Sequence, residues 1–138
     1  MPKIVFMFAG AAALGAAAFS HYHVSAQWRP ILVFGGPEHR DFLGCANCAE
    51  GVAESIWNEN SKYGLENKYG VWNRFGPNGS KYAANSACNP YTLNPPILVD
   101  NDGNSYGRLS VNPYAQGSIC GVTGNKGMCT SLKGACFD

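Results

Sequence analysis

Residues 55–73 read SIWNENSKYGLENKYGVWN and contain two copies of one short motif. The copies are Ser55-Ile56-Trp57-Asn58 and Gly70-Val71-Trp72-Asn73, and Ser86-Ala87-Cys88-Asn89 follows as a third. Their Trp or Cys positions are 57, 72 and 88, so the spacing is 15 and then 16 residues. Aromatic steps of one type lie between them: Lys62-Tyr63-Gly64, Lys68-Tyr69-Gly70 and Lys81-Tyr82. This regularity predicts a small structural unit repeated along the chain.

The repeat region, residues 55–91, has the composition of turns. It alternates aromatic residues with Gly, Asn and Ser, and it sustains neither the 3.6-residue period of a helix nor the two-residue period of a strand. We therefore expect closely packed turns with one aromatic side chain per unit.

The segments that flank the repeats predict regular structure. Residues 30–35 place four apolar residues between breakers, which indicates a short strand. Cys45, Cys48, Val52 and Ile56 recur at three- and four-residue spacing, which favours a short helix that runs to about residue 57. Residues 95–112 place an Asp-Gly step between two runs of strand-forming residues, so they predict a β-hairpin.

Residues 1–26 have the features of a secretory signal peptide. Lys3 supplies a positive start, an uncharged apolar run extends from Ile4 to Phe19, and Val24-Ser25-Ala26 forms a small-residue cleavage site. The run has 16 residues, whereas a membrane span needs about 20. We expect an exported mature chain, periplasmic or extracellular, that begins at Gln27, and not an integral membrane protein.

The mature chain is short and electrically balanced. Its 112 residues (138 minus 26) fit a single small domain, with the repeats at 55–91, the hairpin at 95–112 and a Cys-rich tail at 117–138. Removing Lys3 from the ten basic residues leaves nine, against nine acidic ones. A nucleic-acid partner or a polybasic membrane surface normally needs a basic excess, so the composition favours neither.

All six cysteines lie in the mature part: Cys45, Cys48, Cys88, Cys120, Cys129 and Cys136. An even number in an exported chain predicts three disulfides, with 15 pairings open. The expected fold class is therefore a small disulfide-stapled domain, mainly β and irregular turns, with one β-hairpin and one short helix.

The order of these motifs resembles a family of uncharacterised secreted bacterial proteins. That family has tandem Ser-Ile-Trp-Asn units, Tyr-Gly-Ser-x-Tyr spacers, an upstream Leu-Gly-Cys-x-x-Cys and a downstream Pro-Pro hairpin segment, and the match covers residues 42–112. The resemblance implies no activity and no functional residues. This chain departs from it where Cys88 stands at a Trp position, which hints that Cys88 pairs with the C-terminal tail.

The Cys45-x-x-Cys48 pair has four interpretations. It suits a redox dithiol, yet no βαβ pattern surrounds it, so a structural disulfide is favoured. Zinc held with His39 and Cys88 matches no standard spacing, and a c-type haem would need His where Ala49 stands. We expect neither a metal nor a cofactor.

Calcium binding and hydrolysis have equally weak signals. Asp100-x-Asp102-x-Asn104 resembles the first ligand positions of a calcium-binding loop. Ser105 and Val111, however, occupy the positions where such a loop needs Gly and Glu. A hairpin turn explains the same residues. Only His39 remains in the mature chain to support a catalytic triad. Carboxylate pairs drawn from Glu50, Glu54, Glu59 and Glu66 lie in a polar stretch typical of a solvated surface. We therefore expect no catalytic residues and no enzymatic activity.

Binding is the favoured function. Flat rings suit sugar faces and amides suit hydroxyl groups, which indicates a glycan-binding or protein-binding surface of the cell envelope. The candidate ligand-binding residues are Trp57, Trp72, Tyr63, Tyr69, Tyr82, Asn58 and Asn73. The alternative for the two tryptophans is the core of a small domain, and the alternative for the asparagines is turn capping. The runner-up function is a self-assembling structural component, and a thiol–disulfide oxidoreductase or small hydrolase comes third.

Overall fold

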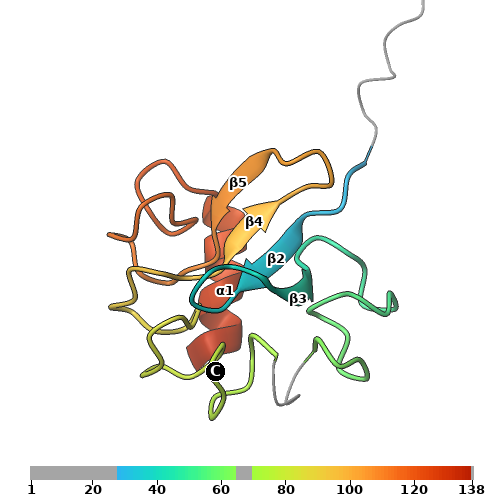
Figure 1. The fold of residues 1–138 in the computed structure, drawn as a ribbon, viewed down its shortest axis with the longest axis horizontal. Helices are drawn as coiled ribbons and strands as arrows, with labels where there is room; N and C mark the ends of the chain where they lie inside the picture. The colour runs from blue at the N-terminus through green and yellow to red at the C-terminus, as the bar shows by residue number, and fades with distance from the viewer. Residues whose placement is uncertain (1–27, 65–69, 138) are drawn as a thin grey trace, which may run out of the picture.

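The computed structural model describes residues 28–64 and 70–137, so the expected signal peptide lies outside the described residues. Strands β2 (Leu32–Gly35), β3 (Asp41–Cys45), β4 (Ile97–Val99) and β5 (Ser105–Arg108) form one antiparallel sheet in the order β3-β2-β4-β5. Helix α1 (Lys126–Phe137) lies behind this sheet in Figure 1, and turns surround both. The expected fold class is confirmed, including the hairpin, the single helix and three disulfides.

The predicted strand and hairpin are both present. Strand β2 occupies the apolar run after Pro30, and β4 pairs with β5 across the turn at Gly103, whose φ is 85°. The sequence did not reveal β3, because Asp41 and Gly44 interrupt its apolar pattern. Gly44 has a φ of 116° and lies against Tyr63 and Ile56, so it joins the sheet closely to the first repeat.

The helix predicted over residues 45–57 is wrong. The backbone there closes in three-residue steps, with the N–H of Val52 bonded to Ala49 and that of Ser55 bonded to Val52, both at 3.0 Å. The apolar spacing that suggested a helix comes from a chain of turns joined to β3 by a parallel bridge between Cys45 and Ser55. The helix lies instead in the tail, where its glycines and few large apolar residues concealed it.

Turns repeat every three residues through much of the chain. The N–H of one residue bonds the C=O three positions earlier from 49 to 64, again from 70 to 76 and from 80 to 92, and finally from 112 to 124. We call these residues (49–64, 70–92 and 112–124) the turn stack. The positions that close the turns are mostly Ser, Asn, Gly, Ala or Thr, whose short side chains suit tight turns. The described residues of the region 55–91 thus form turns with little regular helix or strand.

Within the described residues, five short segments share this turn geometry, two more than the three copies given above, and each is called a unit here. Ser110-Val111-Asn112 and Ser118-Ile119-Cys120 fold like the earlier copies. In the four units that begin with Ser, its hydroxyl accepts the N–H two residues later, at 3.0 to 3.1 Å. The middle residue of every unit lies in one buried cluster: Ile56, Val71, Ala87, Val111 and Ile119.

The third position of the unit joins neighbouring parts of the stack. Trp57 donates its indole N–H to the carbonyl of Ala46 at 2.8 Å, and Trp72 donates to that of Ile56 at 2.5 Å. The two rings pack with centroids 5.0 Å apart. Where the third residue is cysteine, a disulfide to α1 takes the place of the ring.

Two disulfides fasten α1 to the stack. Cys88 is bonded to Cys136 and Cys120 to Cys129, so the pairing of Cys88 with the tail is present. Cys129, Leu132 and Cys136 are spaced along one face of the helix, and Leu132 is its buried residue. The third bond, Cys45–Cys48, closes the turn at the end of β3. The helix therefore depends on covalent attachment more than on its own apolar face.

The disulfides should differ in their effect on stability. Replacing both Cys88 and Cys136 by Ala opens a link with a sequence separation of 48, which the chain-entropy model values at about 4 kcal/mol. Replacing Cys45 and Cys48 opens a separation of 3 and should cost about 2 kcal/mol. Urea unfolding of the oxidised variants measures both, and equal losses would contradict the expectation.

Two glycines offer a second test. A Cβ added at Gly64 would overlap the carbonyl oxygen of Asn58, whereas one at Gly51 would meet nothing within 4 Å. We expect Gly64→Ala to lower the free energy of unfolding by about 1–3 kcal/mol, as overpacking does. Gly51→Ala is the matched control and should change it little. Similar stabilities for the two variants would argue against the turn geometry described above.

Candidate functional site

The tryptophans among the candidate residues lie in the interior. Trp72 is only 7% exposed and belongs to the buried cluster, and Trp57 packs against that cluster with part of its ring accessible. Both indole N–H groups are bonded to backbone carbonyls. Their aromatic faces therefore serve packing within the stack, which is the structural alternative given above.

The candidate asparagines cap turns. Asn58 donates to the carbonyl of Val52 at 3.0 Å and accepts the N–H of Asn60 at 2.9 Å. The side-chain oxygen of Asn73 accepts the N–H of Phe75 at 2.9 Å. These amides therefore hold the backbone of their turns in place.

The candidate tyrosines have different surroundings. Tyr63 is half-buried against Phe42, with the ring centroids 5.1 Å apart and the Lys62 amino group 5.1 Å from the Tyr63 centroid. Tyr82 is almost fully exposed. Tyr69 lies outside the described residues. The structure thus separates the candidates and does not assemble them into one site.

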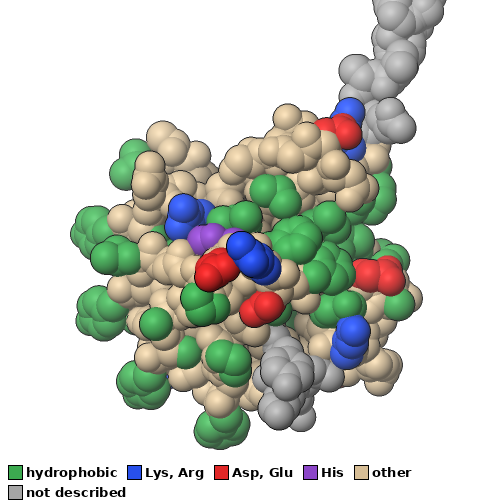
Figure 2. Space-filling view, viewed as in Figure 1, with side chains coloured by type: hydrophobic (Ala, Val, Ile, Leu, Met, Phe, Trp, Pro, Cys, Tyr) green, Lys and Arg blue, Asp and Glu red, His purple; other side chains and the backbone are tan. Residues whose placement is uncertain are grey.

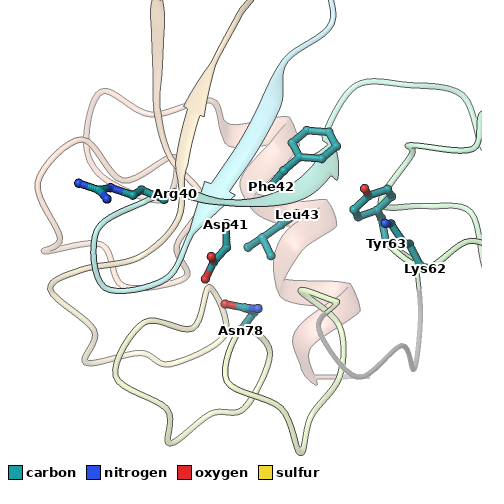
Figure 3. Close-up of a pocket in the computed structure, with 7 residues that line it drawn as sticks. All are labelled: Arg40, Asp41, Phe42, Leu43, Lys62, Tyr63 and Asn78. Carbon is teal, nitrogen blue, oxygen red and sulfur yellow. The ribbon is translucent and has the colours of Figure 1, made fainter.

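Tyr63 borders a shallow cavity of about 450 Å³ next to β3. Figure 3 shows Lys62 and Tyr63 on one side, Asp41 and Asn78 directed toward each other on the other, and Arg40 pointing away. Leu43 lies between the two sides. The polar groups of this cavity do not converge on one point, so it is a weaker candidate than the surface described next.

Four aromatic side chains project from the turn stack almost free of contact. Phe75 is 92% exposed, Tyr82 and Tyr91 are each 86% exposed, and Tyr114 is 89% exposed. We call these four residues the aromatic edge. In Figure 1 the turns that carry them run along the lower and left sides of the molecule, and Figure 2 shows separate hydrophobic side chains projecting along the same margin. Rings exposed to this extent make the aromatic edge the candidate surface for binding.

One local geometry presents all four rings. Each aromatic residue comes two positions after an Asn or Ser. The side-chain oxygen of that Asn or Ser accepts a hydrogen bond from the backbone N–H of the aromatic residue, at 2.9 to 3.1 Å. Asn89 and Asn112 also donate, to the carbonyls of Ala83 and Thr92 at 2.9 and 2.8 Å. The backbone beneath the rings is therefore fixed before any ligand arrives, which lowers the entropy lost on binding.

Phe75, Tyr91 and Tyr114 are not among the candidate residues given above. The signal that identifies them is the triplet Asn-x-aromatic, present as Asn73-Arg74-Phe75, Asn89-Pro90-Tyr91 and Asn112-Pro113-Tyr114. This triplet follows from turn capping and not from the Trp spacing, so a search for the longer repeat overlooks it.

The groups considered for catalysis or metal binding have structural partners. His39 donates its Nε2–H to the carbonyl of Pro95 at 2.9 Å, and Cys45, Cys48 and Cys88 are in disulfides. Within the described residues, no three His, Cys, Asp or Glu side chains cluster in a way suited to a metal ion. Glu66 lies outside these residues.

Asp100 is the buried acid of the hairpin turn. Its carboxylate accepts the side-chain N–H of Asn104 at 2.9 Å, the backbone N–H groups of Asp102 and Asn104, and the hydroxyl of Tyr106 at 2.8 Å. These bonds, led by that of the Asn104 side chain, hold the pKa of Asp100 far below its ordinary value. Arg29 approaches the same carboxylate at 3.9 Å and pairs with Asp102. The oxygens that resembled calcium ligands are thus used to close the turn.

Asp100 should make the domain acid-sensitive. Because its pKa is lowered by folding, its contribution to stability is complete above the ordinary pKa of about 3.9 and is lost as the pH falls below it. Asp100→Asn should lower stability at pH 7 and flatten its decline between about pH 4 and 2. Thermal unfolding across this range tests both effects. Glu38→Gln, at an exposed ion pair, is the control and should leave the decline unchanged.

Comparisons with known proteins give no relative. No protein-family model, no curated protein and no solved structure matches the chain. Among the described residues, no helix is both long enough and apolar enough to cross a membrane. Function must therefore be argued from the residues of the aromatic edge, because a fold alone does not define one.

Proposed function

We propose that this protein is an exported, non-catalytic binding module that holds a cell-envelope glycan on its aromatic edge. The observation behind the proposal is the exposure of Phe75, Tyr82, Tyr91 and Tyr114, each at least 86% accessible in a domain short of core residues. Burying such a ring on folding would stabilise the domain by about 1.5–3 kcal/mol. Leaving four of them outside is reasonable if they are buried later, against a ligand.

The chemistry of these rings suits sugars. An aromatic face packs against the C–H groups of a pyranose ring, and three of the four residues add a phenol hydroxyl that bonds sugar hydroxyls. The rings are separated, each on its own turn, unlike the continuous apolar core of a protein–protein interface. Separated rings can each contact one unit of a polymeric ligand. They therefore suit a chain of sugar units better than the continuous apolar surface of a protein partner.

Disulfides support the proposed compartment. Three of them staple a chain of this size, and the thiols of all six cysteines are used. Bonds of this kind form and persist outside the reducing cytosol. The disulfides and the signal peptide expected from residues 1–26 together support periplasmic or extracellular placement.

Self-assembly is the second candidate, and exposed aliphatic groups favour it. Leu93, directly after the second segment of the turn stack, is 76% exposed, and Val122, within its third segment, is 96% exposed. Copies that pack edge to edge would bury these groups. Sedimentation velocity over a range of concentrations separates the candidates, since only assembly increases the mass.

The aromatic edge can be tested directly. Oxidised protein should co-sediment with peptidoglycan or an envelope polysaccharide, and Tyr82→Ala with Tyr91→Ala should weaken binding by at least about tenfold, as expected for loss of two ring contacts. Trp28→Ala is the control, because Trp28 is also exposed but lies before β2, away from the turn stack. Binding that survives the double change, or that is lost with Trp28, would overturn the proposed surface.

A further inference from the structure

The aromatic edge lies on a part of the chain without carboxylates. Residues 70–93 and 112–126 contain no Asp or Glu, yet they include Arg74, Lys81 and Lys126. The nine acidic residues all lie elsewhere in the sequence, in a chain whose total charge is +1. In Figure 2 the acidic side chains appear at the centre, right and top of the molecule, and none appears on its left and lower margins. The charged side chains in the segments that carry the rings are therefore all basic.

Two of the cations are sequence neighbours of the rings. Arg74 precedes Phe75 and Lys81 precedes Tyr82, and all four side chains are exposed. Among the described residues, neither Arg74 nor Lys81 takes part in an ion pair; the pairs there involve Arg29 and Arg40. At these two positions an exposed ring therefore follows, in the sequence, an exposed cation that takes part in none of these ion pairs.

The rings belong to neighbouring turns of one stack. The N–H of Ala87 bonds the carbonyl of Asn78 at 3.2 Å, and the N–H of Val111 bonds that of Ala87 at 3.0 Å. The segments that carry Phe75, Tyr82, Tyr91 and Tyr114 are therefore joined backbone to backbone. Contacts repeated along such a stack suit an extended ligand that repeats its own units, because binding at successive units is multivalent.

We propose that the ligand of the aromatic edge is a linear acidic polysaccharide with repeated carboxylates, of the polyuronate class. This inference rests on the proposed function and adds the ligand's charge and its polymeric form. The sugar faces pack on the rings, and the uronate carboxylates pair with Arg74 and Lys81. A single-stranded nucleic acid also combines flat units with anions, but its dense phosphate charge demands a larger basic excess than this chain has.

The first experiment compares two polymers that differ only in charge. Oxidised protein is titrated with polygalacturonate and with the same polymer after its carboxylates are reduced to hydroxymethyl groups. We expect at least about tenfold tighter binding to the acidic polymer, and we expect the preference to shrink as salt is raised, because these exposed charges are screened. Equal binding to both polymers would overturn the charge inference and leave the proposed function standing.

The second experiment locates the charge. Arg74→Gln with Lys81→Gln should reduce affinity for polygalacturonate by about tenfold and leave affinity for the reduced polymer unchanged. Arg40→Gln with Lys62→Gln removes the same charge from the cavity of Figure 3, away from the edge, and should have little effect. Equal losses in the two pairs would mean that net charge alone acts, which contradicts a site at the edge. Urea midpoints confirm that each variant is folded.

Two further outcomes are decisive. Oligo(dT) bound as tightly as polygalacturonate would overturn the glycan class in favour of polyanions in general. Failure to bind either polymer, peptidoglycan or any envelope polysaccharide would reject the proposed function itself, and the charge inference with it.

Discussion

The need of every backbone N–H and C=O for a partner governs this structure more than apolar burial does. Long helices and strands meet that need in most domains, but here the sheet is small and α1 has 12 residues. The turn stack meets it locally, by closing the chain every three residues and by using Ser and Asn side chains as additional acceptors and donors. The many Ser and Asn residues supply these side-chain hydrogen bonds, and the many Gly residues allow the tight turns.

Packing follows from that constraint. Each unit contributes its middle residue to the buried cluster, which also includes side chains of the sheet and of α1. These middle residues are Ile56, Val71, Ala87, Val111 and Ile119. The third residue then decides how a unit is held, through an indole bond to a neighbouring carbonyl or a disulfide to α1. Tryptophan and cysteine at this position thus have the same structural role, because each attaches a turn to the rest of the domain.

Local chemistry made part of the fold predictable. The strand after Pro30, the hairpin and the turn-rich repeats each depend on neighbouring residues, and the sequence identifies them. The helix over 45–57 was wrongly predicted because a three-residue turn period imitates helical spacing. The fourth and fifth units escaped notice because the hairpin separates them from the third and because Asn112 and Cys120 replace Trp. At the site, Tyr82 was identified, whereas burial of Trp72 depends on contacts from distant residues that no local pattern reveals.

The placement of the hairpin between the third and fourth units has a consequence for how such a chain can change over time. Strands β4 and β5 lie within the run of units, yet the stack resumes after them with the same turn geometry. A unit that closes on itself tolerates insertion at its borders and duplication of its neighbours. Insertion or deletion of one unit then lengthens or shortens the turn stack and leaves the packing of the other units unchanged. Related chains can therefore differ in the number of units and share one architecture.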